Sequence, residues 1–468
     1  MMKHTLLAVS EFTGRRARFF EQMPDNSVAL FAAAEEVTRS NDTEYPFCQN
    51  KNFYYLTGFN EPDALLLLIK QKEADELVCQ SVLFCREKNP MQEIWHGRRI
   101  GPEQASGEYG FDASFACEEI DELVPKYLED KAQLLFCQGA DEKFDRRVLN
   151  WNSQVKAKVR QGGKAPGVLI DCSAIIDEMR LIKSPDELDI MRKVNRISGQ
   201  AHQRAMEKTR PGKFEYQIEA ELLHEFARHG ARHPAYGSIV AGGDNANILH
   251  YTDNNDILKN NELLLIDAGG ELAGYAADIT RTFPVNGKFT PEQKAIYQLV
   301  LDAQELAIKA IAPGKTLAYL NEITCEFLTR GLHQLGILTG DLTELIAARA
   351  CKKYFIHGLG HWLGLDVHDV GDYQVDKKRQ QLRAFEPGMA MTIEPGLYIP
   401  LHDVNEDIAT PVDEKWRGIG VRIEDNILVT ETGYENLTVN APKTIAEIEA
   451  LMAENTGAEA DVTGQHSH

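Results

Sequence analysis

Residues 357–369 read HGLGHWLGLDVHD, a stretch rich in both histidine and glycine. It places three histidines within twelve residues, with three glycines among them. A lone histidine is more often a satisfied core residue than a ligand, but glycines let the backbone of a histidine cluster approach a bound group closely. The pattern therefore indicates one histidine that binds a metal ion and others that lie beside it.

Two acidic residues upstream of this stretch lie on apolar segments. Asp267 ends the apolar run 263–266, and Asp278 lies in the predicted strand 275–281. The residues between them suffice for a turn at 269–270 and a returning strand, which would let the two carboxylates face each other. A buried carboxylate needs a partner, and for Asp278 that partner is either a metal ion or Arg281. This pair alone supports both interpretations equally.

Two further acids follow the histidine stretch. Glu394 ends a strand-like run before Pro395 and Gly396, and Glu424 shares a strand face with Arg422 by alternation. An ion pair on a solvated face would also explain Glu424. Four carboxylates on apolar strands nevertheless repel one another unless cations lie among them, and two divalent metal ions would meet that need. Oxygen ligands with one histidine favour Mn²⁺, Co²⁺ or Fe²⁺, and Zn²⁺ fits as well.

The chain from residue 177 to residue 452 has the pattern of two related halves. Residues 184–187 (SPDE) and 290–293 (TPEQ) are both capped helix starts with proline at the first helical position. A Pro-Gly-Lys triplet and a second helical stretch follow in each half, and then an apolar strand that ends in Asp267 or Glu394. We interpret the pattern as an internal duplication, in which two α/β halves bring these two acids together across a pseudo-two-fold axis.

Residues 1–176 are expected to form a separate domain of mixed α/β structure. Residues 65–69 and 81–85 are predicted to be buried strands, because they are short apolar runs. The last residues, 453–468, are small and polar and are expected to be a disordered tail. The fold class is therefore α/β (α+β), with two domains and a tail.

Charge and composition exclude several classes of function. The 468 residues include 50 Lys and Arg and 71 Asp and Glu, so the net charge is −21. Such a surface repels phosphate backbones and anionic membranes, and we expect neither nucleic acid nor membrane as a partner. No apolar run approaches the length of a membrane span or a signal-peptide core, and eight scattered cysteines lack any CxxC pair. A cytoplasmic location with reduced thiols is the expectation.

The stretch 357–369 resembles the signature of the Xaa-Pro aminopeptidases and proline dipeptidases. These are metallopeptidases of the pita-bread fold, which creatinase and methionine aminopeptidase share. Residues 41–58, 94–99 and 417–425 are particularly similar to the bacterial aminopeptidase P group. The resemblance implies a metal-dependent aminopeptidase that hydrolyses the bond between an N-terminal residue and a following proline, by means of a hydroxide bridging two metal ions.

The resemblance also implies a role for each predicted metal ligand. Asp267 and Glu424 would bridge two divalent ions, of which Mn²⁺ is expected first. Asp278 would bind one ion, and His361 and Glu394 would complete the other. Glu394 would also accept the proton of the bridging water as general base.

Further roles are implied for residues around the metal ions. His250 would contact the substrate near the scissile bond, His357 would contact the peptide beyond it, and His368 would help to stabilise the tetrahedral intermediate. Supporting positions are implied for four more side chains, which are Tyr398 and Arg422 beside the site and Asp42 and Trp95 from the N-terminal domain. Those last two would close the substrate pocket in an oligomer, expected to be a homotetramer.

Two other functions are consistent with parts of this pattern. A proline dipeptidase would cleave only Xaa-Pro dipeptides, so cleavage of a tripeptide distinguishes the two enzymes. A non-catalytic peptide-binding protein on the same fold would be expected to have lost ligands, and all five are present.

Overall fold

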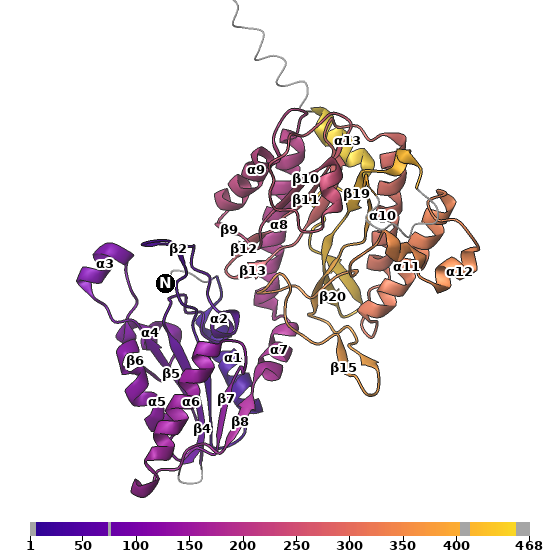
Figure 1. Ribbon diagram of the computed structural model, residues 1–468. Coiled ribbons are helices and arrows are strands. Elements are labelled where there is room, and N and C mark those ends of the chain that lie inside the picture. The colour runs from indigo at the N-terminus through magenta and orange to yellow at the C-terminus, as the bar shows by residue number, and fades with distance from the viewer. Residues whose placement is uncertain (1–5, 74–75, 403–411, 455–468) are drawn as a thin grey trace, which may run out of the picture. The chain divides into compact units, whose positions relative to one another are not determined.

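The computed structural model describes residues 6–73, 76–402 and 412–454, and it divides the chain into two compact units, Met1–Arg180 and Leu181–His468 (Figure 1). The domain boundary expected at residue 176 falls inside helix α7 (Ser173–Leu181). The expected tail from residue 455 onward lies outside the described residues, while residues 453 and 454 belong to helix α13 (Ile445–Glu454). In the described part of the chain, every helix is too short or too polar to cross a membrane.

The N-terminal unit is built on a six-stranded mixed sheet with the strand order β6-β5-β4-β1-β7-β8. The strands are β1 (Ser27–Ala32), β4 (Leu65–Glu73), β5 (Glu76–Cys85), β6 (Ala113–Ala116), β7 (Gln133–Phe136) and β8 (Val168–Asp171). Both predicted strands are confirmed, because residues 65–69 lie in β4 and residues 81–85 in β5, where all are buried. The two strands pair antiparallel, with Leu65 opposite Phe84.

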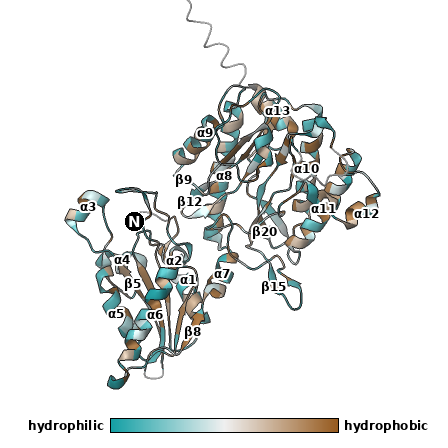
Figure 2. Ribbon diagram, viewed as in Figure 1, coloured by the Kyte–Doolittle hydropathy of each residue, from teal (hydrophilic) through white to brown (hydrophobic). Residues whose placement is uncertain are grey.

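Helices complete the N-terminal unit. They are α1 (Val9–Gln22), α2 (Lys51–Thr57), α3 (Pro90–His96), α4 (Pro102–Tyr109), α5 (Ile120–Leu128), α6 (Glu142–Ala157) and α7, and a small hairpin joins β2 (Thr38–Ser40) to β3 (Thr43–Glu44). Val124 of α5 and Trp151 of α6 belong to the same buried apolar cluster as Leu67 of β4. Figure 2 shows the resulting pattern, with hydrophobic strands and hydrophilic residues on the outer faces of the helices.

The C-terminal unit contains the two helix pairs that the duplication predicts. Its helices are α8 (Pro185–Lys208), α9 (Glu215–Arg228), α10 (Pro291–Lys309), α11 (Leu317–Gln334), α12 (Leu342–Ala347) and α13, and α8 contacts α9 as α10 contacts α11. Both predicted capping boxes are confirmed. Ser184 and Glu187 exchange hydrogen bonds at the start of α8, and Thr290 and Gln293 do so at the start of α10.

Short antiparallel sheets lie between these helix pairs (Figure 1). Their strands are β9 (His233–Pro234), β10 (Ile239–Gly242), β11 (Leu263–Asp267), β12 (Gly270–Leu272), β13 (Tyr275–Ala276), β14 (Thr280–Pro284), β15 (Gln374–Asp376), β16 (Gln381–Leu382), β17 (Ala390–Ile393), β18 (Gly396–Ile399), β19 (Ile419–Arg422), β20 (Asp425–Thr430) and β21 (Gly433–Asn436). In one half β11 pairs with β14, and in the other β17 pairs with β20. The backbone N–H of Glu424 donates to the carbonyl of Thr280 over 3.0 Å and so joins the halves.

The expected hairpin between Asp267 and Asp278 is wrong in detail. The chain does not turn at residues 269–270 but forms an extra hairpin, β12–β13, whose turn is at Ala273 and Gly274, both with positive φ. The predicted single strand 275–281 is therefore split between β13 and β14. Gly269 is needed because the backbone carbonyl of Ala277 occupies the space that a Cβ would take.

Candidate metal centre

A cavity of about 290 Å³ in the C-terminal unit is lined by all five predicted metal ligands. They are Asp267 at the end of β11, Asp278 before β14, His361 in the glycine-rich stretch, Glu394 after β17 and Glu424 after β19. Ligand atoms of Asp278, His361 and Glu424 lie within 4.8 Å of one another. The strand ends of both halves thus converge on one cavity, and the expected meeting of Asp267 with Glu394 in a shared site is confirmed.

His361 is oriented with one ring nitrogen toward the acids. Its Nδ1 lies 2.9 Å from the carbonyl oxygen of Trp362, which can only accept, so Nδ1 carries the proton. Its Nε2 lies 3.4 Å from Asp278 Oδ2 and 3.5 Å from Glu394 Oε1. Fixing a ligand histidine through its other nitrogen is typical of metal sites.

Burial of the acids in this cavity raises the pKa of three of them. Burial raises the pKa of Asp267 to about 6, although Arg422 opposes the shift, and burial raises that of Glu394 to about 7. Burial and the neighbouring acids raise the pKa of Glu424 well above its usual value. Burial lowers the pKa of His361, but Asp278 and Glu394 raise it more, to about 9. Predicted ligands that bind protons this strongly are suited to bind divalent cations, which would replace the protons.

The pKa of Asp278 shifts in the opposite direction to those of the other three acids. Burial raises its pKa, but hydrogen bonds and charge from His361, together with the hydroxyl of Tyr236, outweigh burial and lower it. The alternative partner Arg281 is excluded by geometry, because its guanidinium pairs with Asp425. The backbone of Asp278 is held by Asn426, whose Oδ1 accepts from the Asp278 N–H at 2.9 Å and whose amide donates to the Asp278 carbonyl.

Tyr236 is a site residue that the sequence analysis missed. Its hydroxyl lies 2.6 Å from Asp267 Oδ1 and also contacts Asp278 Oδ1, so it shares one proton between two predicted ligands. Nothing in the sequence signals this role, because Tyr236 is an isolated aromatic residue in the irregular segment between β9 and β10.

Two threonines beside the glutamates were also missed. Thr280 Oγ1 donates to Glu424 Oε2 over 2.7 Å, and Thr392 Oγ1 donates to Glu394 Oε1 over 3.1 Å. Thr392 also accepts from the backbone N–H of His361. A signal for Thr392 exists, because it lies two residues before Glu394 on an apolar strand and so shares its face.

Arg422, Tyr398 and His357 form a directed chain of hydrogen bonds. His357 Nδ1 lies 2.7 Å from the carbonyl of Gly358, which makes Nδ1 the donor and Nε2 the acceptor. The Tyr398 hydroxyl therefore donates to His357 Nε2 over 2.8 Å, and Arg422 Nη1 donates to Tyr398 over 2.9 Å. Burial lowers the pKa of His357 to about 3, so its ring is neutral at the cavity wall.

The other predicted histidines lie at the opening of the cavity. His250 and His368 both line it, and both are solvent-exposed. The ring centroids of His368 and His361 are 4.2 Å apart, edge to face. Burial and the charge of His361 lower the pKa of His368. By contrast, Asp42 and Trp95 are exposed residues of the N-terminal unit.

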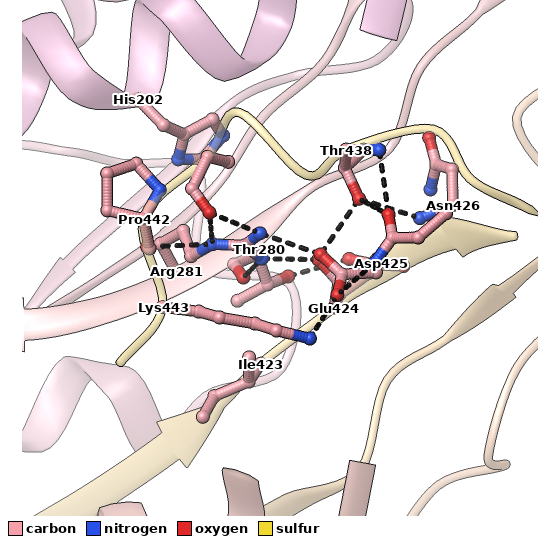
Figure 3. Close-up of polar contacts among 12 residues, drawn as sticks. His202, Thr280, Arg281, Ile423, Glu424, Asp425, Asn426, Thr438, Pro442 and Lys443 are labelled. Atoms are coloured by element: carbon pink, nitrogen blue, oxygen red, sulfur yellow. Dashed lines mark hydrogen bonds and ion pairs between the residues drawn. The ribbon is translucent and has the colours of Figure 1, made fainter. Parts of the chain in front are cut away.

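A buried ionic network follows Glu424 in the chain (Figure 3). Arg281 Nη2 donates to Asp425 Oδ1 and Lys443 Nζ donates to Asp425 Oδ2, both over 2.6 Å. Arg281 Nη1 also donates to the backbone carbonyl of Glu424 over 2.6 Å. Thr438 adds a third hydrogen bond to Asp425. The network therefore fixes the backbone of a predicted ligand from behind.

Comparisons with known proteins agree with this geometry. The model of metallopeptidase family M24 matches residues 189–431, and that of the aminopeptidase P N-terminal domain matches residues 12–136. An Xaa-Pro aminopeptidase of Escherichia coli (strain K12) is 48% identical over 94% of this chain and 97% of that protein. The solved structure of aminopeptidase P from E. coli with the inhibitor Pro-Leu matches with a TM-score of 0.91 and 46% identity, over 96% of this chain and 99% of that one. A zinc-substituted form of that E. coli protein in complex with product matches equally well.

Proposed function

The chain belongs to metallopeptidase family M24, and from that premise we propose that it removes the first residue from peptides whose second residue is proline. The observation that carries the proposal is that all five predicted ligands line one cavity, in a chain 48% identical to an Xaa-Pro aminopeptidase. An Xaa-Pro bond has no amide N–H and a fixed ring, so it requires a dedicated pocket.

Asp267, Asp278, His361, Glu394 and Glu424 would hold two divalent cations. Four carboxylates and one imidazole favour Mn²⁺, with Co²⁺, Fe²⁺ or Zn²⁺ as alternatives. Bound there, the cations would supply hydroxide at neutral pH and polarise the scissile carbonyl.

Glu394 would move the proton of the reaction. Its carboxylate lines the cavity together with the other four predicted ligands, where it can accept a proton from the attacking water and pass it on. Thr392 holds the Glu394 carboxylate through Oε1, which leaves Oε2 for the proton.

The histidines at the opening would bind the substrate. His250 and His368 are exposed on the cavity wall, where His368 can donate to the carbonyl oxygen as negative charge develops on it. His357, held neutral and fixed by Tyr398, would contact the peptide beyond the scissile bond.

We also propose a homotetramer, in which the N-terminal unit of one copy closes the substrate pocket of a neighbouring copy. Helix α3 supports this, because three large apolar side chains are exposed on its seven residues: Met91 at 69%, Ile94 at 74% and Trp95 at 80%. Such a cluster indicates an interaction surface. Trp95 and Asp42 are the side chains that we expect to contribute, and sedimentation of the wild type and of Trp95→Ser tests the assembly.

The experiment that tests the activity compares an Xaa-Pro dipeptide with an Xaa-Pro-Yaa tripeptide, with and without chelator and added Mn²⁺. We expect metal-dependent release of the first residue from the tripeptide. Cleavage of the dipeptide alone would identify a proline dipeptidase. Cleavage of neither peptide by protein with bound metal would favour a peptide-binding protein.

A further inference from the structure

Gln304 of helix α10 lies behind the cavity and connects β17 with β19, the strands that precede Glu394 and Glu424. Its side chain is fully buried. The Nε2 group donates to the backbone carbonyl of Ile393 and to that of Ile423, each over 3.1 Å. These residues immediately precede Glu394 and Glu424. One amide group therefore holds the backbone beside two predicted ligands that are thirty residues apart in the sequence.

The two carbonyls lie where each strand ends. Strand β17 ends at Ile393 and β19 ends at Arg422, so that Glu394 and Glu424 can turn into the cavity. A carboxamide nitrogen has two donor hydrogens, and Gln304 places one on each carbonyl. The separation of the two strand ends is thus set by a single planar group.

Lys443 fixes the orientation of this amide. Its Nζ donates to Gln304 Oε1 over 2.8 Å and to Asp425 Oδ2 over 2.6 Å. An ammonium group can only donate, so it determines which end of the carboxamide is oxygen and which is nitrogen. Figure 3 shows Lys443 reaching Asp425, which directly follows Glu424. Gln304 uses both its donors and its acceptor within the network.

We propose that Gln304 is a positioning residue that sets the spacing of Glu394 and Glu424 and therefore the affinity and geometry of the metal pair. The inference rests on the proposed metal site. No atom of Gln304 itself touches that site. Residues that orient metal ligands typically change metal affinity or activity by about 10–100-fold when they are replaced.

Gln304→Glu tests the proposal most sharply. The variant keeps the size of the side chain and an acceptor for Lys443, but its carboxylate has no hydrogen for either carbonyl and repels both. Gln304→Met is the second variant, because it removes the donors without adding charge. Gln298→Glu is the matched control, since it makes the same change at an exposed position of the same helix.

The measurements are the binding isotherms of Mn²⁺ and Co²⁺, the visible spectrum of the Co²⁺-loaded protein, and kcat and KM on a tripeptide. For Gln304→Glu we expect at least about tenfold weaker binding of one ion, an altered Co²⁺ spectrum and a lower kcat at similar KM. Gln304→Met should change in the same direction, and Gln298→Glu should match the wild type. If Gln304→Glu does not fold, the same measurements on Gln304→Met test the proposal.

Folded Gln304 variants with wild-type metal affinity and an unchanged Co²⁺ spectrum would overturn the inference, even if their stability falls. Failure of the proposed function would be recognised from the wild type and not from the variants. In that case the wild type itself would not bind two ions or would not cleave the tripeptide, whatever the variants do.

Discussion

Arg422 Nη2 lies 2.6 Å from Asp267 Oδ2, so an arginine of the second half neutralises a predicted ligand of the first. The same guanidinium donates to the hydroxyls of Thr280 and Tyr398. It is buried, with a side chain only 5% exposed. Arg422 thus reaches its three partners through three separate nitrogens, Nε, Nη1 and Nη2, whereas a lysine would have to serve them from one nitrogen.

Arg422→Lys should therefore fail to replace arginine. Lysine keeps the charge but can satisfy only part of the set, and Asp267 is left incompletely paired in a buried site. We expect Mn²⁺ affinity and kcat/KM to fall by about 10–100-fold. Arg330→Lys, on the exposed face of α11, is the control. Titration calorimetry and steady-state kinetics check the prediction, and wild-type affinity in Arg422→Lys would contradict it.

Metal affinity should rise with pH between about pH 5 and 8. Asp267 and Glu394, with pKa values raised to about 6 and about 7, and His361, with a pKa raised to about 9, hold protons that a cation must displace. Below each pKa, protons compete, and each competing group weakens binding by up to about tenfold per pH unit. Calorimetry in buffers of different ionisation enthalpy measures the released protons. Binding that releases no protons and does not depend on pH would refute the assigned ligands.

Glu394→Gln should retain the shape of the site and lose proton transfer. An amide cannot accept the proton of the attacking water, so kcat should fall by about 10²–10⁴-fold with a much smaller change in KM. Glu386→Gln, at an exposed position before β17, is the matched control. The metal content of each preparation must be measured with the kinetics. Near-normal kcat in metal-loaded Glu394→Gln would remove Glu394 from its proposed role.

Removal of one partner of the buried pair Arg281–Asp425 should strongly destabilise the C-terminal unit. Both side chains are fully buried and 2.6 Å apart, so Asp425→Asn leaves uncompensated positive charge and should cost about 3–5 kcal/mol. The exposed pair Arg192–Glu435 serves for comparison, and Glu435→Gln should cost less than about 1 kcal/mol. Thermal and urea unfolding of the metal-free protein distinguish the two. Equal effects of both substitutions would contradict the assignment.

The same pair gives the pH dependence of stability a definite sign. Burial raises the pKa of Asp425, but Arg281 and Lys443 outweigh burial and hold it well below its usual value. A carboxyl with a depressed pKa stabilises the folded state above its unfolded pKa of about 4, and this contribution is lost as the pH falls further. Asp425→Asn should therefore unfold with less dependence on pH below about pH 4 than the wild type.

The cavity-lining acids are predictable from sequence for a physical reason. A charge that ends an apolar strand is costly to bury without a partner, so Asp267 and Glu394 stand out in the chain. The repeated capping boxes and Pro-Gly-Lys triplets reveal the two halves, because helix ends need particular residues. Residues whose role depends on their immediate neighbours in the chain can therefore be recognised from the sequence.

Residues that act through distant partners leave no such signal. A single glutamine on an amphipathic helix, such as Gln304, has no distinctive neighbours, and its role depends on carbonyls about 90 and 120 residues away. Tyr236 is similar, since its two carboxylate partners come from other strands. The extra hairpin β12–β13 was missed because Gly269 and Gly270 resemble a turn, whereas Gly269 is needed for close backbone packing.

The proposed activity depends on five side chains that hold two metal ions in one cavity. Anomalous diffraction at the manganese edge, from crystals grown with Mn²⁺, tests it most directly. We expect two anomalous peaks inside the cavity, with Asp267, Asp278, His361, Glu394 and Glu424 as their protein ligands. A single peak, or peaks bound by other side chains while these five remain paired with Arg422, Tyr236 and one another, would contradict it.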